Sequence, residues 1–270
     1  MLPILYRTPM SEPPYTTQLQ AGLGLVAETG RLIESWEPGM VGQDLLHQSL
    51  ASGHFPTMSA RRLRNIIIEA FAPRYLANDA QPARILKILL GRVQPADWRQ
   101  LLFLFTCRAN PILADFVRDV YWTRYAAGNQ MVTKGETTGF VERAVALGRT
   151  STRWSESTII RVSRYLLGSC ADFGLLGPMK ADARGIIPFR ITPITISILA
   201  HGLHFRGLGD NAVIRHDDWA LFGLEPQDIL QEMKRLALRG EIIVQSAAEI
   251  TQIGWKYQSM EDIANGLAEG

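Results

Sequence analysis

Five consecutive apolar residues, 101–105, lie in the middle of a segment that has polar residues toward both of its ends. On a helix, five successive positions point in nearly all directions around the axis, so a helix at the surface would expose some of them to water. Such a helix has to lie inside a bundle of other helices. The sequence therefore predicts a mainly α protein built around a helix over residues 96–109.

Prolines mark the helices expected around this central one. Pro82, Pro95 and Pro111 lie at or just before helix starts, where the missing N–H costs no hydrogen bond. Apolar residues with helical spacing follow each proline, and short loops separate the segments. We expect a central helical bundle over residues 79–190, with helices over 82–93, 96–109, 111–126 and 136–147.

Residues 1–78 are expected to form an N-terminal domain. Apolar residues at helical spacing predict one helix over 19–36 and a shorter one over 42–52. After a glycine and a tight turn, a third helix starts at Ser59 and runs to residue 71. Two short helices joined by a tight turn have the outline of a helix-turn-helix.

The second helix of this motif is basic near its N-terminus. Between residues 55 and 76, four arginines stand against a single glutamate. The helix turns its apolar face inward, so the positions that remain exposed are candidate DNA contacts: Arg61, Arg62, Arg64 and Asn65. The alternative is an ordinary solvated helix face without a ligand.

A second basic patch spans residues 143–190, with eight basic residues against three acidic ones. A helix expected over 155–173 exposes Arg161 and Arg164, which are three positions apart and therefore lie on one face. The whole chain has 28 basic and 26 acidic residues, so its net charge of +2 hides both patches. A short strand over 186–191 follows.

Residues 191–270 are expected to form a winged-helix domain. Helical spacing predicts three helices, over 194–205, 217–222 and 225–238. The period then changes, and two β-prone segments that can pair as a small hairpin follow, over 242–245 and 250–253. Three helices and a two-stranded hairpin form the winged-helix arrangement, in which the third helix commonly enters the DNA major groove.

The third helix of this domain has an apolar face, and its other side carries the candidate DNA contacts Gln227, Gln231, Lys234 and Arg235. Gln and Arg side chains suit base edges, and Lys suits phosphates. The alternative is a protein-interaction surface, because acidic residues on the same helix weaken its attraction to DNA.

The chain lacks the sequence motifs of common catalytic sites, such as a Gly-rich phosphate loop, a nucleophile elbow or a zinc-protease motif. The five histidines form no metal-ligand pattern, and Cys107 and Cys170 lie in apolar helical patterns, where buried thiols are expected. Asp217 and Asp218 are explained by the dipole at a helix start. We therefore expect no enzymatic activity, no metal and no cofactor.

The longest apolar runs are too short for a membrane span, and the N-terminus lacks the pattern of a signal peptide. We expect a cytoplasmic protein that contacts no membrane.

Three short stretches carry a family resemblance. They are Tyr6-Arg7-Thr8, the segment 50–56 with the arginine-rich helix after it, and the segment 154–158, which opens a long helix. Together they resemble the BrxA family of BREX bacteriophage-exclusion systems. The resemblance implies an all-helical fold similar to the RNA-binding antitermination protein NusB, DNA binding through helix-turn-helix-like parts, and a role in phage defence beside a methyltransferase and other BREX proteins, without catalysis. It assigns no contact residue.

These observations predict a non-catalytic protein that binds double-stranded DNA in antiviral defence. The arginines of the two basic patches would contact phosphates, and the C-terminal helix would add a second contact. Two alternatives stay open. One is a protein-interaction adaptor that holds other BREX proteins, and the other is RNA binding by the helical bundle.

Overall fold

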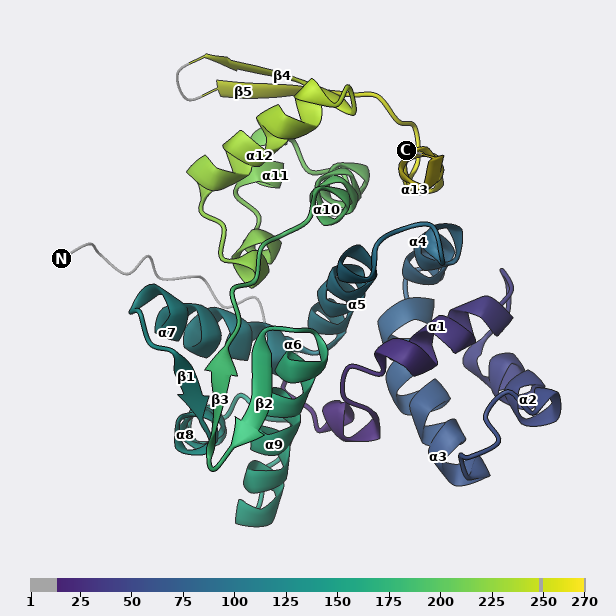
Figure 1. Ribbon diagram of the computed structural model, residues 1–270, viewed down its shortest axis with the longest axis vertical. Coiled ribbons are helices and arrows are strands. Elements are labelled where there is room, and N and C mark those ends of the chain that lie inside the picture. The colour runs from purple at the N-terminus through teal and green to yellow at the C-terminus, as the bar shows by residue number, and fades with distance from the viewer. Residues whose placement is uncertain (1–13, 248–249, 270) are drawn as a thin grey trace.

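The computed structural model describes residues 14–247 and 250–269 and is mainly helical, with two small antiparallel sheets (Figure 1). The predicted mainly α class is confirmed. The described elements up to residue 126 are helices: η1 (Gln18–Ala21), α1 (Val26–Ser35), α2 (Gly42–Ser52), α3 (Ala60–Arg64), η2 (Asn65–Leu76), α4 (Gln81–Leu89), α5 (Pro95–Ala109), α6 (Pro111–Phe116), η3 (Val117–Tyr121) and α7 (Trp122–Ala126). Tyr6, Arg7 and Thr8 of the family resemblance lie outside the described residues.

The second part of the chain adds short strands to the helices. Its elements are β1 (Met131–Thr133), α8 (Lys134–Ala146), α9 (Glu156–Asp172), β2 (Leu176–Lys180), β3 (Ala183–Ile186), α10 (Pro193–Phe205), α11 (Asp210–Ile214), η4 (Asp217–Phe222), α12 (Pro226–Leu238), β4 (Ile242–Ala247), β5 (Ile250–Trp255) and α13 (Met260–Glu269).

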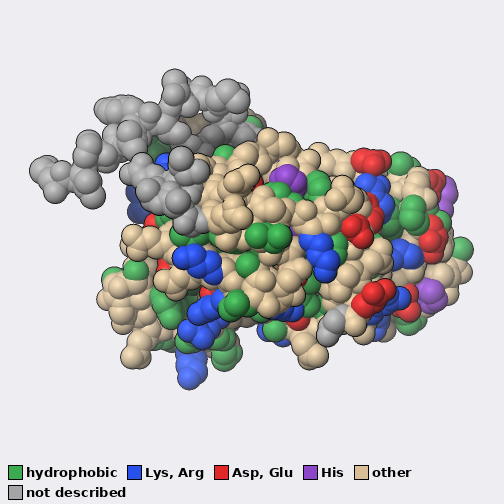
Figure 2. Space-filling model, turned by 90° about the horizontal axis from the view of Figure 1, so that it is seen from above, with side chains coloured by type: hydrophobic (Ala, Val, Ile, Leu, Met, Phe, Trp, Pro, Cys, Tyr) green, Lys and Arg blue, Asp and Glu red, His purple; other side chains and the backbone are tan. Residues whose placement is uncertain are grey.

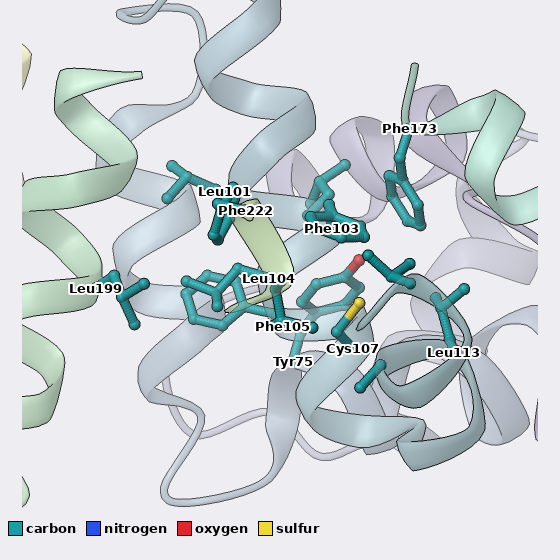
Figure 3. Close-up of a cluster of buried hydrophobic side chains, with 14 of the residues drawn as sticks. Tyr75, Leu101, Phe103, Leu104, Phe105, Cys107, Leu113, Phe173, Leu199 and Phe222 are labelled. Carbon is teal, nitrogen blue, oxygen red and sulfur yellow. The ribbon is translucent and has the colours of Figure 1, made fainter. Parts of the chain in front are cut away.

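Helix α5 is the central helix that its apolar run predicts, since all five residues of the run are buried. Around it gather Tyr75 of η2, Leu199 of α10 and Phe222 of η4 (Figure 3). The ring centroid of Phe103 lies 5.6 Å from that of Phe173 and 5.6 Å from that of Phe222. One hydrophobic core therefore joins residues from all three expected domains, whose boundaries stay a prediction.

The helix that Ser59 caps continues further than predicted. Ser59 Oγ accepts a hydrogen bond from the Arg62 N–H at 3.2 Å, as a cap does. From Asn65 on this helix is the π-helix η2, which extends beyond Phe71 through Pro73 to Leu76. In an α-helix the proline ring would clash with the carbonyl four residues earlier, and the wider π-turn relieves that clash. The buried Tyr75 ring packs 5.1 Å from Phe71, so core contacts favour the extension.

The single helix predicted over residues 19–36 is two helices, η1 and α1, with a break at Leu25, whose φ is +49°. Arg74 is buried beneath the break. Its guanidinium donates to the carbonyls of Gly22 at 2.6 Å and Leu23 at 2.9 Å. A side chain from η2 thus takes up carbonyls that a continuous helix would use internally, which explains why local periodicity overstates the helix.

A three-stranded antiparallel sheet, in the order β1-β3-β2, replaces the single strand predicted over 186–191. The central strand β3 ends at Ile186, where the prediction begins, and pairs Met131 with Gly185 and Lys180 with Ala183. These strands have three to five residues each, too short to show an alternating pattern. Strands β2 and β3 are neighbours in the chain, whereas β1 joins β3 from a distant segment.

The helices and the hairpin predicted in the C-terminal region are present as α10, η4, α12 and the antiparallel pair β4–β5. Helices α11 and α13 were not predicted. Asp210, at the start of α11, accepts hydrogen bonds from the Ile253 N–H at 2.9 Å and the Trp255 indole at 3.1 Å, and so joins α11 to β5. Helix α13 packs against α4 and α10.

Both cysteines are buried and free, as expected. Burial raises the pKa of the Cys107 and Cys170 thiols well above the usual value, which keeps both protonated. Their role is therefore structural. No helix among the described residues combines the length and the apolar character that a membrane span requires.

Candidate nucleic-acid interface

Arginines from both basic patches of the sequence lie at the same end of the molecule. Arg61, Arg62 and Arg64 belong to α3, and Arg161 and Arg164 belong to the N-terminal half of α9. The N-termini of α3 and α9 both point to the lower end of the molecule in Figure 1. Helix η1 packs between η2 and α9 and so lies between the two patches. We call this end, with these five arginines and Asn65, the α3–α9 face.

A groove of about 500 Å³ runs along η1 in this face. Its wall is mostly polar and includes Asn65 of η2, Tyr165 of α9 and Gln18 of η1. Glu69 is the acidic residue that lines it, and its carboxylate lies 3.9 Å from the guanidinium of Arg64. The groove therefore offers hydrogen-bonding groups between two positively charged helices.

The arginines of this face differ in how free they are. Among the described residues, the guanidinium groups of Arg61 and Arg164 have no hydrogen-bond or ion-pair partner, and both residues are exposed. Arg62 donates to the Ala21 carbonyl at 2.9 Å, which holds α3 against η1. Arg161 lies 3.5 Å from the Thr158 hydroxyl. Arg61 and Arg164 are thus the two cations most available to an external anion.

The residues predicted on the C-terminal helix lie elsewhere. Gln227, Gln231, Lys234 and Arg235 are exposed on α12, which lies at the upper end of Figure 1, opposite the α3–α9 face. Arg235 forms an ion pair with Glu232 on the same helix. Seen from this end, the surface carries both acidic and basic side chains (Figure 2). The predicted contacts therefore form two separate sets rather than one surface.

Two large apolar side chains are exposed close to this second set. Leu238, at the end of α12, is 89% exposed, and Ile243, on β4, is 65% exposed. The buried side of α12 is the apolar face that the sequence predicts, with Ile229, Met233 and Leu236. Exposed apolar groups at the junction of a helix and a hairpin are more typical of a protein contact than of a DNA contact.

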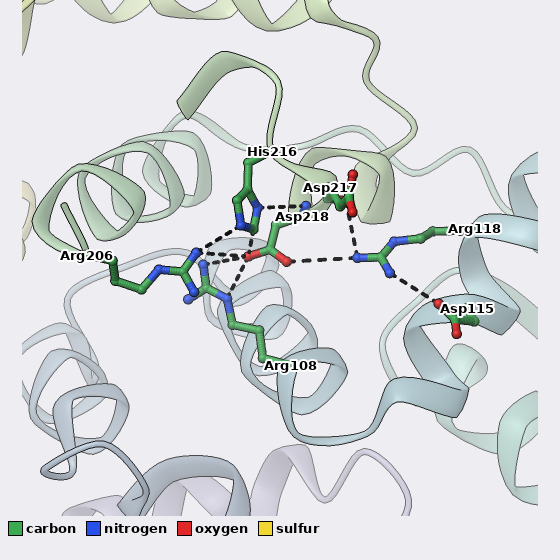
Figure 4. A network of polar contacts seen from close by, with 7 residues as sticks. All are labelled: Arg108, Asp115, Arg118, Arg206, His216, Asp217 and Asp218. Atoms are coloured by element: carbon green, nitrogen blue, oxygen red, sulfur yellow. Dashed lines mark hydrogen bonds and ion pairs between the residues drawn. The ribbon is translucent and has the colours of Figure 1, made fainter. Parts of the chain in front are cut away.

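A polar cluster that the sequence did not indicate surrounds Asp218 (Figure 4). The Asp218 carboxylate lies 2.8 Å from Arg108 Nη2 of α5, 3.9 Å from Arg118 of η3 and 3.9 Å from Arg206 after α10. The His216 imidazole lies 3.7 Å away. One buried carboxylate thus holds together three arginines from three separate elements.

The electrostatics of the cluster follow from this geometry. Burial alone would raise the pKa of Asp218, but the charges of Arg108, His216 and Arg206 outweigh it and hold this pKa below its usual value. Burial lowers the pKa of His216, despite the opposing effect of Asp218, which favours the neutral imidazole. The dipole at the start of η4, our expected explanation for the acidic pair, is thus a minor part of what Asp218 does. No sequence signal could have shown this, because Arg108 and Asp218 are 110 residues apart.

Comparisons with known proteins identify the family. A crystal structure of an uncharacterized protein from Magnetospirillum magneticum is similar, with a TM-score of 0.57 and 13% sequence identity, over 76% of this chain and 98% of that one. This likeness concerns the fold alone. No curated protein matches the chain. The model of the BrxA family matches residues 13–202, and since this is more than half of the sequence, the chain belongs to the BrxA family of BREX-associated proteins.

Proposed function

We propose that this chain is a non-catalytic component of a BREX defence system and binds double-stranded DNA through the α3–α9 face. The observation that carries the proposal is the position of two basic helix ends on either side of one polar groove. These helices come from distant parts of the sequence, and neither basic patch alone would make a surface of this width.

The contacts of this face suit a phosphate backbone. A cation contributes to DNA binding when it neutralises a phosphate and releases a counterion, which requires a guanidinium without an internal partner. Arg61 and Arg164 meet this condition. Arg64 is only loosely paired with Glu69, at 3.9 Å between half-exposed side chains, so it can turn to a phosphate as well. The Asn65 amide in the groove wall can hydrogen-bond base edges.

The finer fold assignments support this proposal. We infer that α2 and α3 form a helix-turn-helix, in which the N-terminus of the second helix approaches DNA. We also infer that α10, α11, α12 and the β4–β5 hairpin form a winged helix. Because α12 lies at the opposite end of the molecule, any DNA contact by α12 is a second, separate contact.

The salt dependence of DNA binding tests the proposal. We expect the logarithm of duplex affinity to fall linearly with the logarithm of salt concentration, by about 0.9 for each phosphate contact. The double variant Arg61→Gln/Arg164→Gln removes two contacts and should reduce this slope by about 1.8. Gel shifts over a salt series, with duplex DNA, single-stranded DNA and RNA, measure it.

The matched control is Arg92→Gln/Arg215→Gln. It removes the same charge from two exposed arginines outside the α3–α9 face, and it should leave the slope unchanged. A flat salt response of the unchanged protein, or equal slopes for both double variants, would contradict DNA binding by this face. Tighter binding to RNA than to duplex DNA would favour the RNA-binding alternative.

A second candidate function is a protein-interaction adaptor that uses α12 and the hairpin to hold other BREX proteins. The exposed Leu238 and Ile243 favour it, and so does the mixed charge at this end of the molecule (Figure 2). A helix that pairs its own arginine with Glu232 has less positive charge to offer to DNA.

Substitution of the exposed α12 residues separates the two functions. Replacing Gln227, Gln231, Lys234 and Arg235 by Ala removes exposed groups only, so the fold should survive. If α12 contacts DNA, this variant loses at least about 1 kcal/mol of duplex affinity while its circular dichroism stays unchanged.

The companion variant Leu238→Ser/Ile243→Ser changes only the apolar pair. Normal DNA binding by both variants, together with lost association with BREX proteins in the apolar variant, would assign this end to the adaptor function. Loss of DNA affinity in the quadruple variant alone would instead assign α12 to DNA.

A further inference from the structure

An arginine-lined cavity lies where η2, α4, α5 and α10 meet, apart from the α3–α9 face. Its volume is about 650 Å³, within the range of small-molecule sites in proteins. Four arginines line it: Arg74, Arg84, Arg108 and Arg206. Asp79 is the acidic residue among the described residues that line it. Whether these four positive charges attract an anion depends on how many carboxylates lie next to them.

Two of these arginines share one carboxylate between them. Arg84 is fully compensated, since Asp79 lies 3.0 Å and Glu261 2.7 Å from its guanidinium. Arg108 and Arg206, by contrast, share the single carboxylate of Asp218. Arg118 draws on the same carboxylate from the far side (Figure 4).

Arg74 is the buried arginine of the four and has no carboxylate partner among the described residues. It is only 4% exposed, and its two Nη atoms donate to backbone carbonyls, which are neutral. Burial lowers the pKa of this guanidinium, because the charge has lost water without gaining a carboxylate. A buried cation of this kind is stabilised most by an anion in the adjoining space.

Arg108 is bound closely to this shared carboxylate. Its Nε donates a hydrogen bond to Asp218 Oδ2 at 2.9 Å, and its Nη2 lies 2.8 Å from the same oxygen. Among the described residues, the four arginines that line the cavity thus have three carboxylates as ion-pair partners, those of Asp79, Glu261 and Asp218, and Arg118 shares the last of them. Positive charge is therefore in excess around the cavity.

We propose that this cavity binds a small phosphate-bearing anion with at least two negative charges, of the nucleoside polyphosphate class. The planar fork of arginine matches phosphate oxygens in pairs, which favours phosphate over a spherical anion. Pro73, Pro82 and Ala109 form apolar parts of the wall, against which a base can pack. The site is independent of the proposed DNA surface, since the two share no residue.

Isothermal titration calorimetry of the full chain at low ionic strength tests this inference, with ATP, inorganic pyrophosphate and adenosine as the probes. We expect saturable binding of ATP and of pyrophosphate, and no binding of adenosine alone. Arg206→Gln removes a cation at the cavity and should weaken ATP binding by about tenfold or more.

Ala77→Glu tests the site without removing a structural contact. Ala77 is exposed and lines the cavity, so the new carboxylate offers the arginines an internal counter-charge and should also weaken ATP binding by about tenfold or more. The matched control is Ala96→Glu, at the far end of α5, which should bind ATP within about twofold of the unchanged protein.

Two results would overturn the proposal. One is the absence of saturable binding of both ATP and pyrophosphate to the unchanged protein. The other is equal ATP affinity of the Ala77→Glu and Ala96→Glu variants. Duplex DNA binding should be the same in all these variants, so a failure of this inference is distinguishable from a failure of the DNA-binding proposal.

Discussion

Replacing Asp218 with Asn is expected to lower the free energy of unfolding by about 3–5 kcal/mol. The substitution keeps the shape of the side chain but removes the one carboxylate that Arg108, Arg118 and Arg206 share. Since Asp218 is only 8% exposed, water cannot replace the lost charge. The three guanidinium groups would then repel one another across the junction of α5, η3 and α10.

Urea denaturation followed by circular dichroism measures this change. The exposed Asp182, in the turn between β2 and β3, provides the matched control, and Asp182→Asn should change the free energy by less than about 0.5 kcal/mol. The double variant Asp218→Asn/Arg206→Gln should recover part of the loss, because it removes one of the stranded charges. If Asp218→Asn were as stable as Asp182→Asn, the cluster would not be what joins these elements.

Acidification from pH 7 to pH 4 should cost the protein about 3 kcal/mol of stability through His201 alone. Burial lowers the pKa of His201 to about 4 from 6.5, despite a hydrogen bond between its Nδ1 and the Ser197 carbonyl. As the pH falls below 6.5, the unfolded chain binds a proton that the folded chain excludes. Stability is therefore lost between pH 6.5 and about pH 4.

This loss should appear first in the hairpin region. The His201 ring packs edge-on against Trp255 of β5 with 4.8 Å between ring centroids, and its Nε2 has no partner among the described residues. The variant His201→Asn cannot titrate, so the difference in unfolding free energy between it and the unchanged protein should shrink as the pH falls from 7 to 4.

Asp218 acts in a lower range of pH. Its pKa is depressed in the folded state, so its contribution is present above the unfolded value of 3.8 and is lost as the pH falls through the folded value. A difference between the His201→Asn variant and the unchanged protein that stayed constant between pH 7 and pH 4 would contradict the role of His201.

The sequence alone determined the helices whose signals are local. Helix α2 has the predicted bounds, and α5 starts at the expected proline and buries its whole apolar run. Helix α9 begins where the sequence predicts, and there Ser155 Oγ accepts a hydrogen bond from the Thr158 N–H. Caps, prolines and apolar spacing act within a few residues, so they can be read without knowing the fold. The same holds for which arginines of α3 and α9 are exposed.

The tertiary structure alone decided where those helices meet. It broke the first helix at Leu25, because Arg74 from another element takes the carbonyls there. It also brought the arginines of α3 and α9 to one face and placed the residues of α12 at the opposite end. The charge of Asp218 became a junction only because folding surrounded it with arginines from distant segments. Such contacts depend on packing between distant segments, so the local sequence cannot predict which partner a buried charge has.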